Sequence, residues 1–365
     1  MSPDVVIVGA GMVGASCAYA LSRAGLKVTV IDRKGVAAGT TGAGEGNILV
    51  SDKEPGPELD LALWSNRLWR EWGAEVGGIE LEPKGGLVVG SSDELPGAQA
   101  SAGVIAEQVD PRSLEPRLAP HLTRGVFYPQ DMQVQPMLAA ARLLRASGAT
   151  VLPGTELTGA HVASGRITSI DSTTGSISTR HVINAAGTWG GPVSSLLGAP
   201  VPVLPRRGFI LVTEPLPPGV IRHKVYTADY VANVASSDEG LETSTVVEGT
   251  ASGTVLIGAS RERVGFDRSL SVPVLRRLAD GAVRLFPFLR DVRLLRAYRG
   301  FRPYCPDHLP VIGPDPRVDG VLHACGHEGA GIGLAPATGV LIASMLTGVS
   351  IPVPATPFSP ERFAS

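Results

Sequence analysis

The amino-terminal 33 residues alternate between two hydrophobic patterns. Residues 5–8 and 27–31 are mostly apolar runs, which are typical of strands buried on both faces of a parallel sheet. The residues between them, 12–24, are small and apolar, and they predict a helix. This segment therefore predicts one strand–helix–strand unit, the building block of a parallel sheet.

Further along the chain, three more helices and one more buried strand are expected. One helix begins at Pro57 and carries three of the four tryptophans, which we expect to pack in the core. Another runs from Pro136 to Gly148, because proline fits the first turn of a helix and glycine follows its last. The third covers 334–346, and residues 182–187 are predicted as a buried strand.

Residues 201–291 have a different character. Strands are expected at 209–213, 243–248 and 254–260 and one helix at 274–285, without alternation of strands and helices. We therefore predict an α/β fold with two domains. A discontinuous Rossmann-type domain takes residues 1–80, 140–200 and 296–365, and a second, α+β substrate domain built on an antiparallel sheet takes 81–139 and 201–295.

Composition and charge exclude several classes of protein. The 45 glycines and 30 prolines make up about a fifth of the 365 residues, too many for a coiled coil or helical repeat. The 44% of hydrophobic residues can fill a large core. Because 32 basic residues face 34 acidic ones without a basic stripe, we expect no nucleic-acid partner.

Neither a membrane anchor nor a disulfide framework is expected. Residues 329–360 carry no charge, but prolines and glycines interrupt them, which indicates a buried helix instead of a membrane span. The amino terminus has no positively charged stretch of the kind that opens a signal peptide. The three cysteines are widely spaced and lack a C-x-x-C motif. We therefore expect a cytoplasmic protein.

A dinucleotide-binding motif follows the first predicted strand. Gly9, Gly11 and Gly14 fit G-x-G-x-x-G at the start of the predicted helix, and Asp32 ends the next strand. The glycines allow a tight turn, the helix N-terminus attracts a pyrophosphate, and the carboxylate accepts ribose hydroxyls. The carboxylate of Asp32 would repel the 2′-phosphate that Arg33 could otherwise attract. The motif predicts one dinucleotide but does not decide between FAD and NAD.

Six segments, in order and spacing, carry a resemblance to a known family: residues 4–33, 39–47, 182–189, 300–303, 307–313 and 326–336. On these the chain resembles the glycine oxidase and D-amino acid oxidase family of flavoproteins. It is closest in character to the glycine oxidase branch and to the flavin subunits of hydrogen cyanide synthase and opine oxidases. The resemblance implies FAD, bound noncovalently, because Gly300 stands where the sarcosine oxidase branch attaches flavin to a cysteine; Cys305 lies nearby.

The resemblance also implies roles for particular residues. Arg302 matches the arginine that binds the substrate carboxylate, which a planar guanidinium can hold through two parallel hydrogen bonds. Tyr226, Tyr230 and Tyr304 are candidates for an assisting hydroxyl that no spacing rule separates. The cofactor-binding residues implied are Gly9, Gly11, Met12, Val13, Gly14, Asp32, Arg33, Thr40, Thr41, Gly46, Asn47, Ala186, Gly187, Trp189, Gly300, Gly329, Gly331, Ile332 and Gly333.

Two features depart from the family pattern or compete with it. Glu45 and Asn47 stand in the flavin-side loop where glycine oxidases carry small residues; Glu45 either meets an amine of the substrate or forms a surface salt bridge. His323, Cys325 and His327 share the spacing of residues on one strand face and could ligate zinc. A strand that enters a glycine-rich flavin loop explains the stretch without metal, so we expect none.

The resemblance implies an FAD-dependent enzyme that oxidises the C–N bond of glycine, an N-substituted glycine or a small D-amino acid. Hydride passes from the substrate carbon to flavin N5, and dioxygen is reduced to hydrogen peroxide. One alternative is a dehydrogenase subunit that passes electrons to a partner chain, and another is a noncatalytic FAD-binding protein. A homo-oligomer is compatible with either enzyme.

Overall fold

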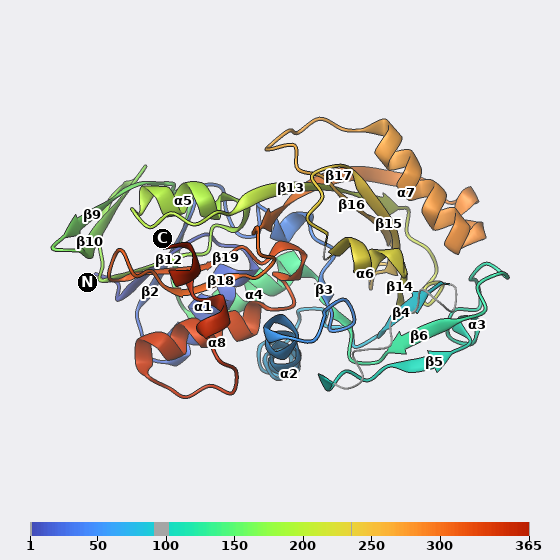
Figure 1. Cartoon of the computed structure of the whole chain (residues 1–365), viewed down its shortest axis with the longest axis horizontal. Helices are drawn as coiled ribbons and strands as arrows, with labels where there is room; N and C mark the ends of the chain where they lie inside the picture. Colours follow the sequence, from blue (N-terminus) through green and yellow to red (C-terminus); the bar gives the residue numbers. More distant parts are fainter. Residues whose placement is uncertain (1, 91–101, 235, 365) are drawn as a thin grey trace.

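Two large sheets lie side by side in the computed structural model, which describes residues 2–90, 102–234 and 236–364 (Figure 1). One sheet has six strands in the order β18-β19-β12-β1-β2-β8. All neighbours in it are parallel except β18 and β19. Its strands are β1 (Val5–Val8), β2 (Val28–Asp32), β8 (Thr150–Pro153), β12 (His181–Asn184), β18 (Val311–Pro314) and β19 (Val321–Cys325).

The apolar residues of strand β1, predicted at 5–8, pack against both faces of the six-stranded sheet. Val5 and Ile7 belong to a core that includes helix α1 (Met12–Arg23), whereas Val6 and Val8 belong to a separate core on the opposite face. The helical face also contains α2 (Pro57–Val76), α4 (Pro136–Ser147) and α8 (Ala335–Thr347). The other face packs on α5 (Gly190–Leu196) and on a small antiparallel sheet of β9 (Leu157–Ala163), β10 (Arg166–Ser172) and β11 (Gly175–Ser178).

The second large sheet has eight strands in the order β17-β13-β16-β15-β14-β4-β6-β5. Its pairs are antiparallel except β14 with β4. The strands are β4 (Gly86–Val89), β5 (Glu107–Val109), β6 (Gly125–Tyr128), β13 (Leu204–Thr213), β14 (Lys224–Thr227), β15 (Glu242–Gly249), β16 (Val255–Arg261) and β17 (Leu294–Tyr304). Four short elements lie outside the two large sheets and the long helices: α3 (Pro111–Leu114), α6 (Asp229–Val234), β3 (Asn47–Ile48) and β7 (Met132–Gln133).

Side-chain alternation along β13 decides what faces the other sheet. Phe209 and Leu211 pack in a core with helix α7 (Val272–Leu285), which covers the outer face of the eight-stranded sheet (Figure 1). Because successive side chains on a strand point to opposite faces, Gly208 and Ile210 point the other way. They line a cavity between the two sheets.

The structure confirms a mixed α/β fold with one parallel and one antiparallel region. It also shows where the segments meet. The boundary expected at residue 296 falls inside β17, whose residues 294–304 pair with β13 in the eight-stranded sheet. Helix α8, expected at 334–346, is observed at Ala335–Thr347 and is mostly buried. Among the described residues, no helix is long and apolar enough to cross a lipid bilayer.

Candidate active site

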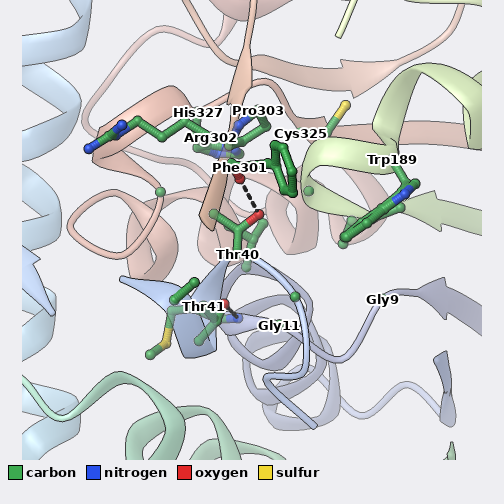
Figure 2. A pocket seen from close by; sticks show the side chains of 18 of the residues that line it. Gly9, Gly11, Thr40, Thr41, Trp189, Phe301, Arg302, Pro303, Cys325 and His327 are labelled. Atoms are coloured by element: carbon green, nitrogen blue, oxygen red, sulfur yellow. Dashed lines mark hydrogen bonds between the residues drawn. The ribbon is translucent and has the colours of Figure 1, made fainter. Parts of the chain in front are cut away.

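A long cavity opens between the two sheets, and most of the residues expected to bind a cofactor line it (Figure 2). Its floor comes from the ends of β1, β2 and β12, and its far wall comes from β13 and β17. The predicted residues that line it are Gly9, Gly11, Met12, Val13, Asp32, Arg33, Thr40, Thr41, Glu45, Gly46, Asn47, Ala186, Gly187, Trp189, Tyr230, Gly300, Arg302, Gly329, Gly331 and Ile332. Gly14, Gly333 and Tyr226 do not.

The glycine motif makes a tight turn into the N-terminus of α1. Gly9 has φ +115°, and a Cβ there would lie 2.4 Å from the carbonyl oxygen of Ala185 on the neighbouring segment. Gly14 acts away from the cavity, since its Cβ would lie 1.9 Å from the Gly9 carbonyl oxygen and would push the helix off the strand. The Met12 backbone N–H donates to the Thr41 hydroxyl at 2.9 Å (Figure 2). The helix N-terminus therefore faces the cavity, as a pyrophosphate site requires.

Asp32 is held firmly at the end of β2. One of its carboxylate oxygens accepts a hydrogen bond from Ala10 N–H at 2.9 Å, and the other accepts from Lys34 N–H at 2.8 Å and Gly35 N–H at 2.9 Å. Because each carboxylate oxygen has two lone pairs, capacity remains for the hydroxyls of a ribose. The carboxylate is thus both a loop clamp and a candidate sugar ligand.

An aromatic platform lies beside Asp32. The Arg33 guanidinium carbon is 4.0 Å from the centroid of the Trp189 ring, and Arg33 also approaches Glu156 at 3.8 Å. On the Trp189 ring stacks Phe266, with centroids 5.5 Å apart. Glu156 lines the cavity but carried no signal in the sequence, because it belongs to the turn after β8 and to no motif. Arg33 and Trp189 both line the cavity, so this stack forms part of its wall next to Asp32.

Three hydrogen bonds join segments that are far apart in the sequence, next to the cavity. The Thr40 hydroxyl donates to the Phe301 carbonyl oxygen at 2.8 Å (Figure 2). The Thr188 hydroxyl donates to the same oxygen at 2.6 Å. The two hydroxyls are 2.9 Å apart. These bonds tie the loop after β2, the segment after β12 and strand β17 to one another.

Helix α2 holds the glycine-rich loop that precedes α8. The Ser65 hydroxyl donates to the Gly333 carbonyl oxygen at 2.6 Å, and Trp69 Nε1–H lies 3.1 Å from the carbonyl oxygens of Ile332 and Gly333. Trp69 is fully buried, as expected for a tryptophan of this helix, but it also acts as a hydrogen-bond donor. Gly333 therefore supports the loop from behind, while Gly329, Gly331 and Ile332 face the cavity.

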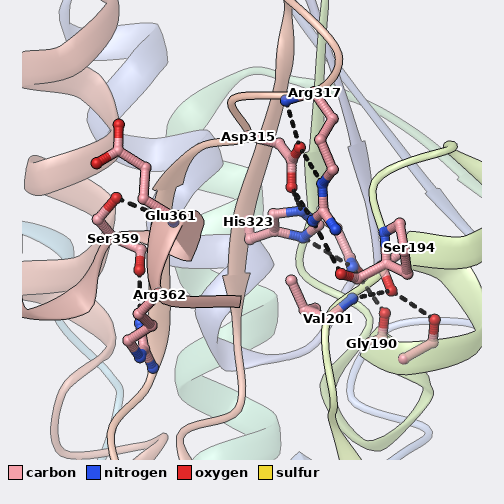
Figure 3. A network of polar contacts seen from close by, with 12 residues as sticks. Gly190, Ser194, Val201, Asp315, Arg317, His323, Ser359, Glu361 and Arg362 are labelled. Atoms are coloured by element: carbon pink, nitrogen blue, oxygen red, sulfur yellow. Dashed lines mark hydrogen bonds and ion pairs between the residues drawn. The ribbon is translucent and has the colours of Figure 1, made fainter. Parts of the chain in front are cut away.

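His323 and His327, the two histidines of the candidate zinc site, have different hydrogen-bond partners. His323 is completely buried and contacts Asp315 at 3.2 Å and Asn184 at 3.3 Å (Figure 3). His327 lines the cavity and lies 3.0 Å from the Thr338 hydroxyl. Burial lowers the pKa of His327 to about 3, so the ring is neutral. In the described part of the chain, no group of three or more potential ligands could hold a metal ion.

Arg302 enters the cavity from β17. Its Nη1 donates to the Ser260 carbonyl oxygen at 2.8 Å, and it passes over Gly208, where a Cβ would lie 2.4 Å from that nitrogen. No carboxylate of the described residues pairs with this guanidinium. Burial, together with the nearby charges of Arg261 and Arg206, lowers the pKa of Arg302 to about 10. The arginine stays charged at neutral pH and is set to receive an anion.

Glu45 supplies a negative charge in the same cavity. Its side chain is 8% exposed, so the surface salt bridge considered for it is absent. One carboxylate oxygen accepts from Asn47 Nδ2 at 2.8 Å, and the other, Oε1, has no hydrogen-bond partner among the described residues. The cavity therefore presents a guanidinium without a carboxylate partner and a carboxylate with one unpartnered oxygen, a combination complementary to the two charges of an amino acid.

The three candidate tyrosines have different positions. Tyr230 lines the cavity, and the Arg261 guanidinium lies 4.9 Å from its ring centroid. Tyr226 is fully buried behind Tyr230, and its hydroxyl bonds to that of Ser51. Tyr304 is also buried outside the cavity lining. Of the three, only Tyr230 lines the cavity. The Tyr226 ring packs in the core, and the Tyr304 ring lies against the side chains of His308, Arg206 and Arg263.

Several cavity residues were not anticipated. Gly208 and Ile210 could have been found from the alternation of the strand expected at 209–213, once the inward face was known. Phe301 and Glu328 lie within segments that carry the family resemblance, but no motif assigns them a role. Cys325 lines the cavity, whereas Cys305, which is close to Gly300 in the sequence, does not.

This fold and cleft define a dinucleotide-binding protein. On one side of the cleft lie the glycine-lined N-terminus of α1 and the end of β2 with Asp32, and on the other lies the largely antiparallel sheet. Residues 4–345 match the sequence model of the family described as FAD dependent oxidoreductase, and the chain belongs to this family. The expected resemblance and the FAD cofactor are thereby confirmed. The cleft fits FAD, because the Gly9 turn leaves room only for bare backbone and the N-terminus of α1 faces it.

Sequence similarity to characterised proteins extends over nearly the whole chain. It is 32% identical to hydrogen cyanide synthase subunit HcnC of Pseudomonas aeruginosa, across 99% of this chain and 96% of that protein. It is 27% identical to glycine oxidase of Pseudomonas putida, across 99% of both. The crystal structure of glycine oxidase from Geobacillus kaustophilus has a TM-score of 0.86 at 24% identity and covers 98% of each chain, which shows a shared fold.

Proposed function

We propose that this enzyme oxidises the C–N bond of a small amino acid: glycine, an N-substituted glycine or a small D-amino acid. The observation that carries the proposal is the guanidinium of Arg302, without a carboxylate partner in the described part of the chain, in the same cavity as the Glu45 carboxylate with its one unpartnered oxygen. The pair matches a substrate with a carboxylate and an amine on one carbon. Similarity to proteins named glycine oxidase supports this substrate class.

Each charged residue has a defined task. Arg302 receives the substrate carboxylate through parallel N–H donors and so fixes the direction of the α-carbon. Glu45 Oε1 accepts a proton from the substrate ammonium, which leaves the neutral amine that can release a hydride from carbon. The ring of Tyr230 forms part of the wall beside Arg302.

FAD, when bound, accepts the hydride from the substrate carbon and passes two electrons to dioxygen, which yields hydrogen peroxide. The α1 N-terminus and Gly11 would hold its pyrophosphate, and Asp32 would hold its ribose. The glycine-rich loop before α8 lines the cavity at Gly329, Gly331 and Ile332, and the positive end of the α8 dipole behind it would favour negative charge on the bound group. The imine formed from the substrate is hydrolysed by water to a carbonyl compound and an amine or ammonia.

A second candidate function is an electron-transferring subunit of a larger complex. The observation that favours it is the 32% identity to a protein named as a subunit of hydrogen cyanide synthase. The chemistry at the substrate is the same in both candidates. They differ only in whether dioxygen or a partner chain receives the electrons.

An anaerobic titration tests the proposal. The yellow protein is mixed with glycine, N-alkylglycines, D-proline and D-alanine, flavin absorbance is followed, and air is then admitted. Rapid recolouring with peroxide release is expected of an oxidase, whereas slow recolouring indicates the electron-transferring subunit. Absence of bleaching with every compound would contradict the amino-acid assignment.

Arg302→Lys tests the carboxylate site. One ammonium cannot reproduce the two-pronged donor, so the half-saturating substrate concentration is expected to rise at least tenfold. Arg296→Lys, on the exposed part of the same strand, is the matched control. Equal kinetics for the two variants would remove Arg302 from carboxylate binding.

A further inference from the structure

A row of buried charges lies behind Glu45 in the eight-stranded sheet. Lys224 on β14 and Glu248 on β15 are directly paired in the register of these strands, and each is 1% exposed. Lys84, in the loop before β4, follows Glu248, and Glu82 follows Lys84. The charges alternate in sign from the cavity to the surface.

Lys224 lacks the partner that a buried ammonium normally requires. Its Nζ has no hydrogen bond to the described residues, and it lies 5.4 Å from the ring centroid of Tyr230. Burial alone would lower the pKa of Lys224, but the charges of Tyr230, Glu248, Glu45 and Asp52 outweigh burial and raise it. The resting side chain is therefore a protonated ammonium, next to the cavity residue Tyr230.

Glu248 likewise makes no hydrogen bond in the described part of the chain, and its ion pair with Lys84 is long. Neither carboxylate oxygen has a hydrogen bond to the described residues, and Oε1 is 3.8 Å from Lys84 Nζ. Burial raises the pKa of Glu248 to about 7, although Lys84 and Lys224 lower it and Glu45 and Glu82 raise it further. A carboxyl group in this range exchanges its proton at neutral pH.

Lys84 connects the row to the surface and back to Glu45. Its Nζ donates to the side-chain carbonyl of Gln133 and lies 3.4 Å from Glu82, whose side chain is 35% exposed. Gln133 Nε2 in turn donates to the Glu45 backbone carbonyl at 3.0 Å. Glu45 and Lys84 are thus held by one side chain.

A purely structural ion pair would not take this form. Buried charges that serve stability are paired at close range, because an unmade hydrogen bond on a buried charge is costly. Here Lys224 has no carboxylate within 4.0 Å in the described part of the chain, although Glu248, Glu45 and Asp52 are all near enough to raise its pKa. Polar atoms without a protein partner are the usual sites of bridging water.

We propose that Glu45, Lys224 and Glu248 form a proton exit from the amine end of the cavity to the surface at Lys84 and Glu82. This inference rests on the proposed function, since the proton concerned is that of the substrate ammonium. Bridging water completes the path where the side chains are not in direct contact.

The proton balance is simple. Glu45 takes one proton from the substrate ammonium and becomes neutral. The Lys224 ammonium first releases a proton to ionised Glu248, which becomes neutral, and the resulting Lys224 amine then takes the proton from Glu45, which returns to its carboxylate form. Glu248 then releases its proton to solvent beside Lys84 and Glu82. One proton leaves the amine, one enters solvent, and every side chain returns to its starting charge.

Glu248→Gln is the primary test. The amide keeps the size of the side chain but cannot carry a proton, so the rate of anaerobic flavin reduction at pH 7 is expected to fall about tenfold. Its pH dependence should also lose the step near neutrality. Glu115→Gln is the matched control, because Glu115 is a fully buried carboxylate of the same sheet region outside the cavity lining.

A double variant tests whether the effect of Glu248→Gln comes only from misfolding. An infrared measurement provides a readout that does not depend on turnover. Lys224→Met combined with Glu248→Gln removes both charges together, so no single charge is stranded, and it should show the same loss of the pH step. In substrate-free protein, pH-difference infrared spectra should contain a carboxyl band that titrates near neutrality and disappears in Glu248→Gln. Persistence of this band, or a wild-type pH profile in both variants, would overturn the proton exit.

These outcomes are separable from failure of the proposed function. If no amino acid bleaches the flavin of the unmodified protein, the function fails while the infrared band still reports on Glu248. If the unmodified protein is reduced and both variants match it at every pH, the function stands and the exit is wrong.

Discussion

Gly208→Ala is a small change that should reach Arg302 directly. Gly208 lies on β13 opposite Gly300, and a methyl group there would lie 2.4 Å from Arg302 Nη1 and 2.6 Å from the Ser260 carbonyl oxygen. Ordinary contacts between such atoms are about 3.5 Å, so the guanidinium must retreat by roughly 1 Å. It would then lose its 2.8 Å hydrogen bond to Ser260.

The size of the effect follows from two estimates. A hydrogen bond made by a charged group contributes about 1.5–3 kcal/mol, or roughly a tenfold to hundredfold change. A displacement of about 1 Å in a positioning group can likewise lower a rate about a hundredfold. We expect kcat/KM for the substrate identified by titration to fall between about tenfold and a hundredfold, with weaker binding of acetate as a simple carboxylate.

The assay combines steady-state kinetics with acetate binding, followed by the change in flavin absorbance, and a thermal melt to confirm folding. Gly159→Ala on β9 is the control, because its Cβ would meet only an ordinary contact at 3.9 Å, away from the cavity. A folded Gly208→Ala variant with unchanged kcat/KM and acetate affinity would refute the placement of Arg302 described above.

Three further predictions concern the cofactor and stability. Gly9→Ala should yield protein that purifies without yellow colour, since its Cβ would collide with the Ala185 carbonyl and its φ of +115° disfavours alanine; a fully FAD-loaded variant would contradict this. Trp69→Phe should lower stability by about 1 kcal/mol and weaken FAD binding, because the Gly333 loop loses a hydrogen-bond donor; denaturant melts and FAD titration measure both. Folding raises the pKa of the Glu248 carboxyl from 4.5 to about 7. As the pH rises from 4.5 to 7, Glu248 therefore ionises in the unfolded chain before it ionises in the folded protein, and the free energy of unfolding should fall by up to about 3 kcal/mol. Glu248→Gln should flatten that part of the stability curve, and an unchanged slope would show that another group is responsible.

Most of the cofactor half of the cleft could be predicted, because the relevant information is local in the sequence. A strand, a glycine turn and a helix follow one another within 33 residues, and the hydrophobic periods report each of them. The same proximity explains why Asp32 could be assigned from its place at the end of a strand. Gly14 and Gly333 differ in detail, since both lie next to the cavity wall and support it from behind.

The substrate half depended on contacts between segments far apart in the sequence. Tyr226 and Tyr230 are four positions apart, yet one is sealed in the core beside Ser51 and the other faces the cavity. Whether Glu45 formed a surface salt bridge was equally open, because its burial results from packing against β16, more than 200 positions away. No spacing rule contains that information.

By itself, the sequence determined the strand–helix–strand unit, the dinucleotide motif and the family, because these follow from neighbouring residues and short-range periodicity. Only the tertiary structure decided which charges share the cavity and which remain unpaired. It did so because pairing β13 with β17 sets Gly208 beneath Arg302, and pairing β14 with β15 sets Lys224 beside Glu248. The charge pattern of the site is a consequence of strand register, which forms only when distant segments meet.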